Sequence, residues 1–128
     1  MSRPPSERTR AVRAALDTDT QHGAVVPPIH LSSTYSFEGY GRRRTYDYSR
    51  SGNPTRDALG GALAELEGGA GAVVTGSGMG AVTLVAHLLK AGELALVPRD
   101  CYGGTFRLFT ALARKELIRV EFVDPTDT

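Results

Sequence analysis

The 128-residue sequence contains one cysteine, Cys101, and therefore cannot form an internal disulfide. This fits a reducing compartment, and we expect the protein to be cytoplasmic. No apolar run approaches the roughly 20 residues of a membrane span. Residues 1–15 also lack the apolar core of a secretory signal. Membrane insertion and export are therefore not supported.

Neither sign of charge dominates the sequence. Fifteen Lys and Arg residues oppose fourteen Asp and Glu residues, which gives a formal net charge of +1. Such a balance gives no overall electrostatic attraction to nucleic acid or to an anionic membrane. The local run from Arg42 to Arg44 lacks interleaved aromatic residues, so we interpret it as a solvated loop. The three histidines, His22, His30 and His87, do not have a ligand spacing, and no metal site is predicted.

The sequence changes character near Pro54. Residues 1–55 hold five of the seven prolines and show little sustained periodicity. Within them, residues 25–31 are expected to be extended, because each proline biases its predecessor away from helix. We therefore predict an N-terminal arm over residues 1–55 that packs on another element, followed by a folded domain over residues 56–128.

Helical and strand-like stretches alternate in this domain. Apolar residues recur at three- and four-residue spacing from Ala58 to Leu66, and Gly68 follows as a helix stop. The further predicted elements are a strand at 70–75, a helix at 79–90, a strand at 94–97, a helix at 105–115 and a strand at 118–123. This βαβαβ order predicts an α/β fold with a mostly parallel sheet. Such sheets bind ligands at the carboxyl ends of their strands, here the loops 75–79 and 98–105.

A glycine-rich turn joins the first of these strands to the next helix. Gly76, Gly78 and Gly80 place free backbone amides at a helix N-terminus, where the helix dipole favours an anion such as phosphate. Gly76, Gly78 and Ala81 also match the G-x-G-x-x-G/A dinucleotide pattern, with Asp100 as a conceivable ribose ligand. Glycines that only permit a tight turn are a third interpretation. The turn alone does not decide among the three.

A second candidate for phosphate binding precedes the first long helix. The Tyr48 hydroxyl and the Arg50 guanidinium lie two residues apart in a segment expected to be extended, so both point to one side. Together they could hold a phosphate through charge-assisted hydrogen bonds. The alternative is a turn in which Arg50 is solvated.

Five ordered segments of the chain resemble one family, the Cys/Met-metabolism enzymes that depend on pyridoxal 5'-phosphate (PLP). The similarity is carried by residues 22–35, 47–56, 63–69, 77–79 and 100–105. It implies PLP as cofactor and an aspartate-aminotransferase-like fold (fold type I), of which residues 56–128 would be the first part of the PLP-binding large domain. It also implies a homo-oligomer, a dimer or tetramer, in which the arm of residues 1–55 contacts a neighbouring subunit.

The resemblance implies roles for individual residues. Gly78 and Met79 match backbone amides that bind the phosphate of the subunit's own PLP, which agrees with the helix-terminus argument. Tyr48 and Arg50 match residues that reach the phosphate of a neighbour's PLP. Tyr102 matches a tyrosine that stacks on the pyridine ring, a role that suits a loop aromatic. Packing under the adjacent turn is the alternative for Tyr102.

Arg107 and Cys101 flank this turn and have less specific surroundings. Arg107 matches an arginine that holds the distal carboxylate of the substrate, a task that suits a bidentate guanidinium. An exposed arginine in the first turn of a helix is the other interpretation. Cys101 has no evident histidine partner, so we expect it to be packed rather than catalytic.

No catalytic residue is identifiable in the sequence. PLP chemistry needs a Schiff-base lysine, and the only lysines, Lys90 and Lys115, do not stand in the setting that the family uses. In the family this lysine comes later in a longer chain, so we expect a truncated chain that is inactive alone. It would be part of a transsulfuration enzyme, half of a split enzyme or a non-catalytic remnant.

The resemblance also implies a reaction and its substrates. The segments most resemble the synthases of the family, which implies γ-replacement: an activated homoserine ester is joined to cysteine in methionine biosynthesis. The lyases and sulfhydrylases of the family share most of the motifs and are the alternatives. The expected ligands are therefore small amino-acid substrates.

Overall fold

The computed structural model of the chain describes residues 5–16 and 18–126 and divides into two units. The first unit is Met1–Val74 and the second is Thr75–Thr128. Among the described residues, no helix has both the length and the apolar character that a bilayer crossing requires. The sequence predicted a different boundary, near Pro54, between an arm that contacts a neighbouring subunit and a domain. That boundary stays a prediction.

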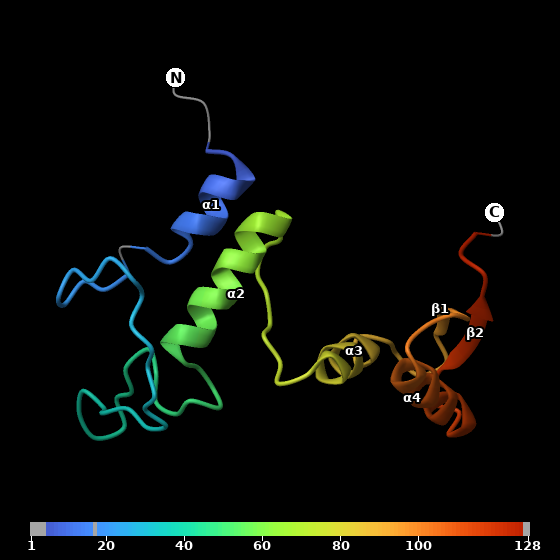
Figure 1. The fold of residues 1–128 in the computed structure, drawn as a ribbon. Coiled ribbons are helices and arrows are strands. Elements are labelled where there is room, and N and C mark those ends of the chain that lie inside the picture. The colour runs from blue at the N-terminus through green and yellow to red at the C-terminus, as the bar shows by residue number, and fades with distance from the viewer. Residues whose placement is uncertain (1–4, 17, 127–128) are drawn as a thin grey trace. The chain divides into compact units, whose positions relative to one another are not determined.

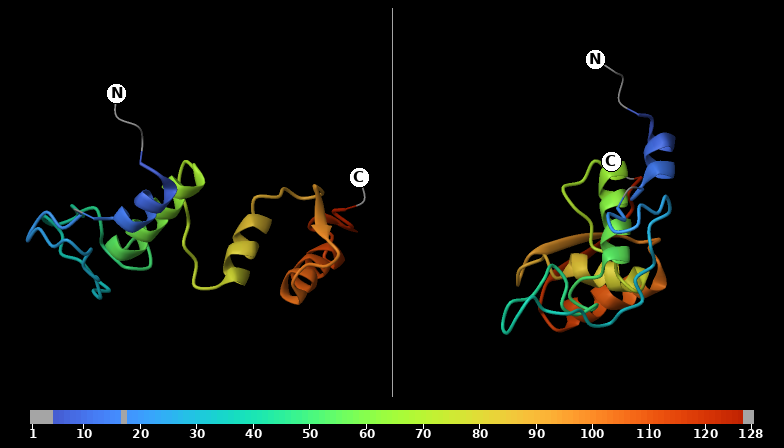
Figure 2. Two further views of the ribbon diagram at one scale, coloured as in Figure 1. Left: turned by 45° about the horizontal axis from the view of Figure 1, so that its top comes forward. Right: turned by 90° about the vertical axis from the view of Figure 1, so that its left-hand side faces the viewer.

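Two helices form the framework of the first unit. They are α1 (Glu7–Arg13) and α2 (Pro54–Glu67), which lie side by side (Figures 1 and 2). α2 begins after Asn53, whose side chain accepts hydrogen bonds from two first-turn amides. It ends at Gly68, where φ is 66° and the amide donates back to the last turn. The predicted helix with a glycine stop is confirmed.

The helix α1 was not predicted from the sequence. Ser6 caps it by accepting a hydrogen bond from the N–H of Thr9, and Glu7 places an acidic group in its first turn. A helix of this length is marginal by itself. It is held to α2 by Arg10, which donates from Nη1 to the carbonyl oxygen of Glu65 at 3.1 Å.

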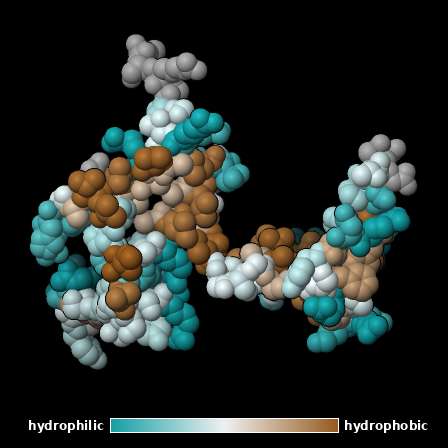
Figure 3. Space-filling model, viewed as in Figure 1, coloured by the Kyte–Doolittle hydropathy of each residue, from teal (hydrophilic) through white to brown (hydrophobic). Residues whose placement is uncertain are grey.

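Irregular chain connects α1 to α2. It contains two isolated bridges, Thr34 with Tyr48 and Gly39 with Arg42. Residues 25–31 form neither helix nor strand, in agreement with the prediction. Val25, Val26, Ile29 and Leu31 of this segment are exposed, Leu31 to 91%. Figure 3 shows hydrophobic side chains in brown at the surface of this unit. An arm that packs on another surface would present such side chains.

The second unit is a small α/β structure. It contains α3 (Gly78–Ala86), β1 (Leu94–Pro98), α4 (Gly103–Arg114) and β2 (Arg119–Val123). β1 and β2 pair in parallel through the crossover helix α4, which lies beside β2 (Figure 2). Five buried residues form the core: Ala86, Ala95, Val97, Phe109 and Ile118. The predicted α/β class with parallel strands is confirmed.

One predicted strand does not form. Residues 70–75 have no ladder partner in the described part of the chain. They run beside α2 instead, where a Cβ atom built on Gly60 would lie 3.3 Å from the carbonyl oxygen of Ala72. A strand exists only through hydrogen bonds to a neighbouring strand. The predicted βαβαβ order is therefore realised as β1–α4–β2, preceded by α3.

The helix α3 is shorter than predicted. The helix ends at Ala86, with His87 as its C-cap, whereas the sequence predicted a helix over 79–90. Leu88 donates to the carbonyl oxygen of Val85, three residues back, so the chain tightens into a turn.

Candidate functional site

The N-terminus of α3 offers two backbone donors. Ser77 caps the helix: its Oγ accepts from the N–H of Gly80 at 3.0 Å, and its carbonyl oxygen accepts from Ala81 at 3.2 Å. The N–H groups of Gly78 and Met79 have no acceptor among the described residues. The space above Gly78 is open, because a Cβ atom built there would meet no atom within 4 Å. Two free amides at the positive end of a helix can hold a phosphate.

The Tyr102 ring lies next to Met79, and Gly104 lies beneath both. A Cβ atom built on Gly104 would lie 2.6 Å from Cε1 of Tyr102 and 2.8 Å from Sδ of Met79. Both side chains therefore occupy the space that a larger residue at position 104 would fill. The Tyr102 side chain is 71% exposed, so its ring is available to a flat ligand.

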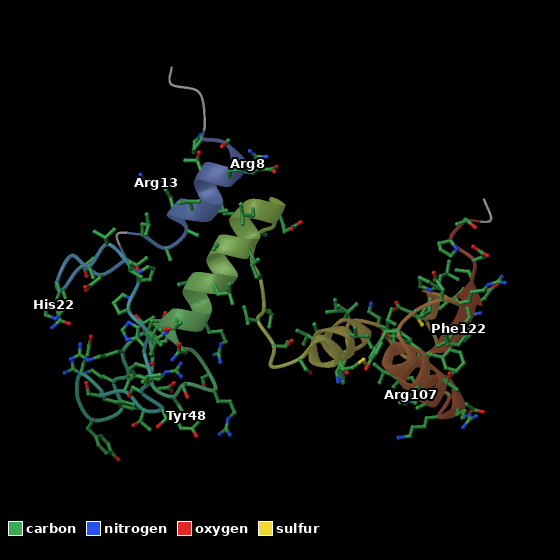
Figure 4. The ribbon with its side chains drawn as sticks, viewed as in Figure 1. Arg8, Arg13, His22, Tyr48, Arg107 and Phe122 are labelled. Carbon is green, nitrogen blue, oxygen red and sulfur yellow. The ribbon has the colours of Figure 1, made fainter. Side chains whose placement is uncertain are left out.

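Arg107 follows one turn into α4 (Figure 4). Its Nη1 atom would lie 3.4 Å from a Cβ atom built on Gly103, so the guanidinium folds back toward the start of the helix. The side chain is exposed, as the alternative interpretation of the sequence expected, and it is near the turn that carries Tyr102. Exposure leaves the guanidinium free to bind a carboxylate.

Two cationic residues beside Arg107 were missed in the sequence. Arg114 and Lys115 line, with Arg107, a depression of about 370 Å³ on α4. The seven-residue spacing from 107 to 114 places both arginines on one helix face and could have revealed the cluster. The Thr110 hydroxyl also lines the depression, and it is buried without a hydrogen-bond partner among the described residues.

Tyr48 and Arg50 come together in the first unit. The Cζ atom of Arg50 lies 5.0 Å from the centroid of the Tyr48 ring, within the range of a cation–π contact. The segment is a turn rather than extended chain, because the amides of Ser51 and Gly52 both donate to the carbonyl oxygen of Tyr48. The backbone is thus the turn of the alternative interpretation, with Arg50 exposed and its guanidinium over the Tyr48 ring. Figure 4 shows Tyr48 on this irregular segment.

Asp47 fixes the backbone next to this pair. Its Oδ2 accepts from Nη1 of Arg43 at 3.1 Å, and its Oδ1 accepts from the N–H of Tyr48 at 2.7 Å. The bond from Arg43, followed by that from the Tyr48 amide, holds the pKa of Asp47 below its ordinary value. This contribution to stability is present above the unfolded pKa of about 3.9 and is lost as pH falls through the lower folded-state pKa.

Acid is therefore expected to loosen the turn at Tyr48. The Tyr48 amide resonance should move as pH falls through the lowered pKa of Asp47, below the ordinary value of about 3.9, because the carboxylate then gains a proton. Asp47→Asn should abolish that transition. Asp124→Asn is the matched control, because the pKa of Asp124 is lowered by Thr126 in the other unit. A Tyr48 titration that survives Asp47→Asn would contradict the assignment.

A cavity of the first unit is formed by residues other than the predicted site residues. It has a volume of about 820 Å³, and its mostly apolar wall is contributed by α2 and by the chain between α1 and α2. Tyr46 is one of its lining residues, and burial, followed by the neighbouring Asp57 carboxylate, raises the pKa of Tyr46. Tyr48 and Arg50 do not line it.

The remaining predicted residue, Cys101, is a free thiol. It is half-buried and packs against the core of the second unit. The second unit thus carries Gly78, Met79, Tyr102 and Arg107, and the first unit carries Tyr48 and Arg50.

Comparison with known proteins supplies the context for these residues. Residues 8–128 match the family described as Cys/Met metabolism PLP-dependent enzyme. Cystathionine γ-synthase of Escherichia coli (strain K12) is 58% identical over 122 residues, which are 94% of this chain and 32% of that protein. Cystathionine γ-lyase of Homo sapiens is 40% identical over 117 residues, which are 91% of this chain and 29% of that protein.

Solved structures agree with the sequence matches. Cystathionine γ-synthase from Xanthomonas oryzae pv. oryzae, crystallised in complex with cystathionine, is similar with a TM-score of 0.91 and 57% identity. The similarity covers 98% of this chain and 33% of that one. The chain spans about a third of the length of the relatives that it matches.

Proposed function

Because the chain belongs to the Cys/Met metabolism PLP-dependent enzyme family, we propose that it contributes the phosphate-anchoring part of a PLP site in a transsulfuration enzyme. One observation carries this proposal. The amides of Gly78 and Met79 have no acceptor among the described residues, and the Tyr102 ring and the Met79 side chain both lie over Gly104. Donors for an anion and a surface for a flat ring therefore adjoin one another, as a phosphorylated pyridine requires.

We propose cystathionine γ-synthase as the activity of the whole protein, in which an activated homoserine ester is joined to cysteine. Relatives at 58% and 57% identity bear that name. Exposed Arg107 supports it, since a guanidinium near the ring would hold a distal carboxylate. Cystathionine lyase activity is the second candidate, supported by lyases at 40% to 45% identity.

In the proposed scheme, the residues of this chain bind and orient PLP. The Gly78 and Met79 amides hold the phosphate, and the Tyr102 ring fixes the plane of the pyridine. When bound, PLP supplies an electron sink for the substrate's α-carbon. Tyr48 and Arg50 complete the phosphate site of a neighbouring subunit, so we also propose a homo-oligomer. The free Cys101 supports a reducing compartment such as the cytoplasm.

Neither lysine is proposed as the residue that attaches PLP. Lys115 is at the C-terminal end of α4, whereas Tyr102 is at its N-terminal end. A helix of 12 residues separates these ends by about 18 Å. Lys90 likewise follows the C-terminal end of α3, whereas Gly78 begins it.

The phosphate site can be tested by removing one donor. Gly78 is the first residue of α3, a position that favours proline, and the preceding Ser77 has the extended backbone that proline requires. Gly78→Pro should therefore keep the helix and lose one N–H. We expect PLP to bind about threefold to tenfold more weakly, with no change for pyridoxal, which lacks the phosphate.

Binding is measured from the Met79 amide resonance during titration with each compound. Glu7→Pro places the same substitution at the first position of α1 and should leave both affinities unchanged. Equal affinity of the unmodified chain for PLP and pyridoxal would sink the proposed phosphate site.

A further inference from the structure

Asn53 uses every polar atom of its side chain. Its Oδ1 accepts from the N–H groups of Thr55 at 2.9 Å and Arg56 at 3.2 Å, which caps α2. Its Nδ2 donates to the carbonyl oxygen of His30 at 3.1 Å and to the hydroxyl of Tyr35 at 3.2 Å. An amide offers an acceptor and a donor together, which neither serine nor aspartate does in the same geometry.

The segment that Asn53 holds is also the segment that holds Tyr48. The N–H of Tyr35 donates to the carbonyl oxygen of Asp47 at 3.0 Å, and the N–H of Ser49 donates to that of Ser33 at 2.8 Å. These two bonds bracket the bridge between Thr34 and Tyr48. The position of Tyr48 is therefore set by residues 33–35, and Asn53 ties those residues to α2.

Two further hydrogen bonds join the start of α2 to His30 and to Arg50. The N–H of His30 donates to Oγ1 of Thr55 at 2.9 Å, so both backbone groups of His30 are bound by the start of α2. Arg56 donates from Nη2 to the carbonyl oxygen of Arg50 at 3.3 Å. The turn that carries Tyr48 and Arg50 is thus fastened at two points to the first turn of one helix.

We infer that Asn53 is a positioning residue for the Tyr48–Arg50 pair and acts through the donor half of its side chain. The inference rests on the proposed role of that pair in phosphate binding. Capping by Asn53 stabilises α2, and donation by Asn53 places the pair. The two functions belong to different atoms and can be separated.

Asn53→Asp separates them. Aspartate caps a helix as well as asparagine does, so α2 should keep its start. A carboxylate cannot donate to the carbonyl oxygen of His30, and the two oxygens would repel each other. Hydrogen exchange of the Tyr35 and Ser49 amides should become roughly fivefold faster, while the amides in the middle of α2 exchange as before.

A second measurement tests phosphate binding by the Tyr48–Arg50 pair. Inorganic phosphate is titrated into the 128-residue chain, and the Nε–H resonance of Arg50 is followed. Asn53→Asp should weaken this response roughly fivefold. Ser6→Ala removes the cap of α1 instead, and it should change neither the two amides nor the Arg50 response.

The two proposals fail in different ways. If Asn53→Asp leaves the exchange of Tyr35 and Ser49 at the unmodified rate, the positioning role is overturned, whatever phosphate does. If the unmodified chain shows no Arg50 response to phosphate, the proposed role of the pair in phosphate binding fails. If amide exchange still depended on Asn53 in that case, Asn53 would position the Tyr48–Arg50 pair, but the pair would not bind phosphate.

Discussion

Gly104→Ala is expected to displace the Tyr102 ring while leaving α4 at least as stable as before. The added Cβ would lie 2.6 Å from Cε1 of Tyr102 and 2.8 Å from Sδ of Met79, closer than nonbonded atoms approach. Both are outer atoms of flexible side chains, so the side chains move and the backbone does not. Alanine also favours a helix over glycine by up to about 1 kcal/mol. Stability and ring position should therefore change independently.

The effect on PLP binding is expected to be large. To stack on the pyridine from its present position, the ring would have to overlap the new methyl group, and such overpacking costs about 1–3 kcal/mol. PLP affinity should fall roughly fivefold to a hundredfold. The free energy of unfolding, measured with urea, should stay equal or rise.

Gly103→Ala is the matched control for this prediction. It adds the same methyl group to the same helix, but the only side-chain atom that it meets is Nη1 of Arg107, at 3.4 Å, an ordinary contact distance. Gly103→Ala should stabilise α4 as Gly104→Ala does, and its affinity for PLP should be unchanged. Similar affinities for the two variants would show that Tyr102 does not act from the position observed.

The sequence predicted the parallel unit because its signals are local. The alternation of helical and strand-like apolar patterns predicted β1, α4 and β2 within two residues of their observed ends. The strand at 70–75 had the same apolar signal and failed, because a strand also needs a neighbour that no local pattern supplies. α1 was missed for the converse reason: its tie to α2 joins Arg10 to Glu65 across 55 positions.

The candidate site was predictable in its residue types and less so in its geometry. The turn at Gly78 and the aromatic at Tyr102 were visible as patterns, but the sequence does not distinguish Gly103, which has room for a side chain, from Gly104, which has none. Asn53 lies in segment 47–56, which carries the family resemblance, but the sequence assigned it no role of its own. Its bonds to His30 and Tyr35 span 23 and 18 positions and depend on the folded chain.

Phe109→Ala should unfold most of the second unit. Phe109 is 7% exposed and packs in a core of only five buried residues. Removing a buried phenyl ring costs about 3–5 kcal/mol, because transfer energy is lost and a cavity remains. A domain of this size has a total stability of only a few kcal/mol, at roughly 0.05–0.15 kcal/mol per residue. The loss is therefore comparable to the whole stability of the unit.

The measurement is amide exchange of β1 and β2 with and without the substitution. Phe106→Ala is the control, because Phe106 is 45% exposed and stacks on Phe122 with ring centroids 4.6 Å apart. Losing that pair should cost about 1 kcal/mol beyond the partial burial of the ring, less than the loss of Phe109, and leave the strands protected. Protected strands in Phe109→Ala would mean that contacts outside the five-residue core stabilise the sheet.

The N-terminus of α3 and the Tyr102 turn should lose their arrangement with the core, so Phe109→Ala should also abolish the preference for PLP over pyridoxal.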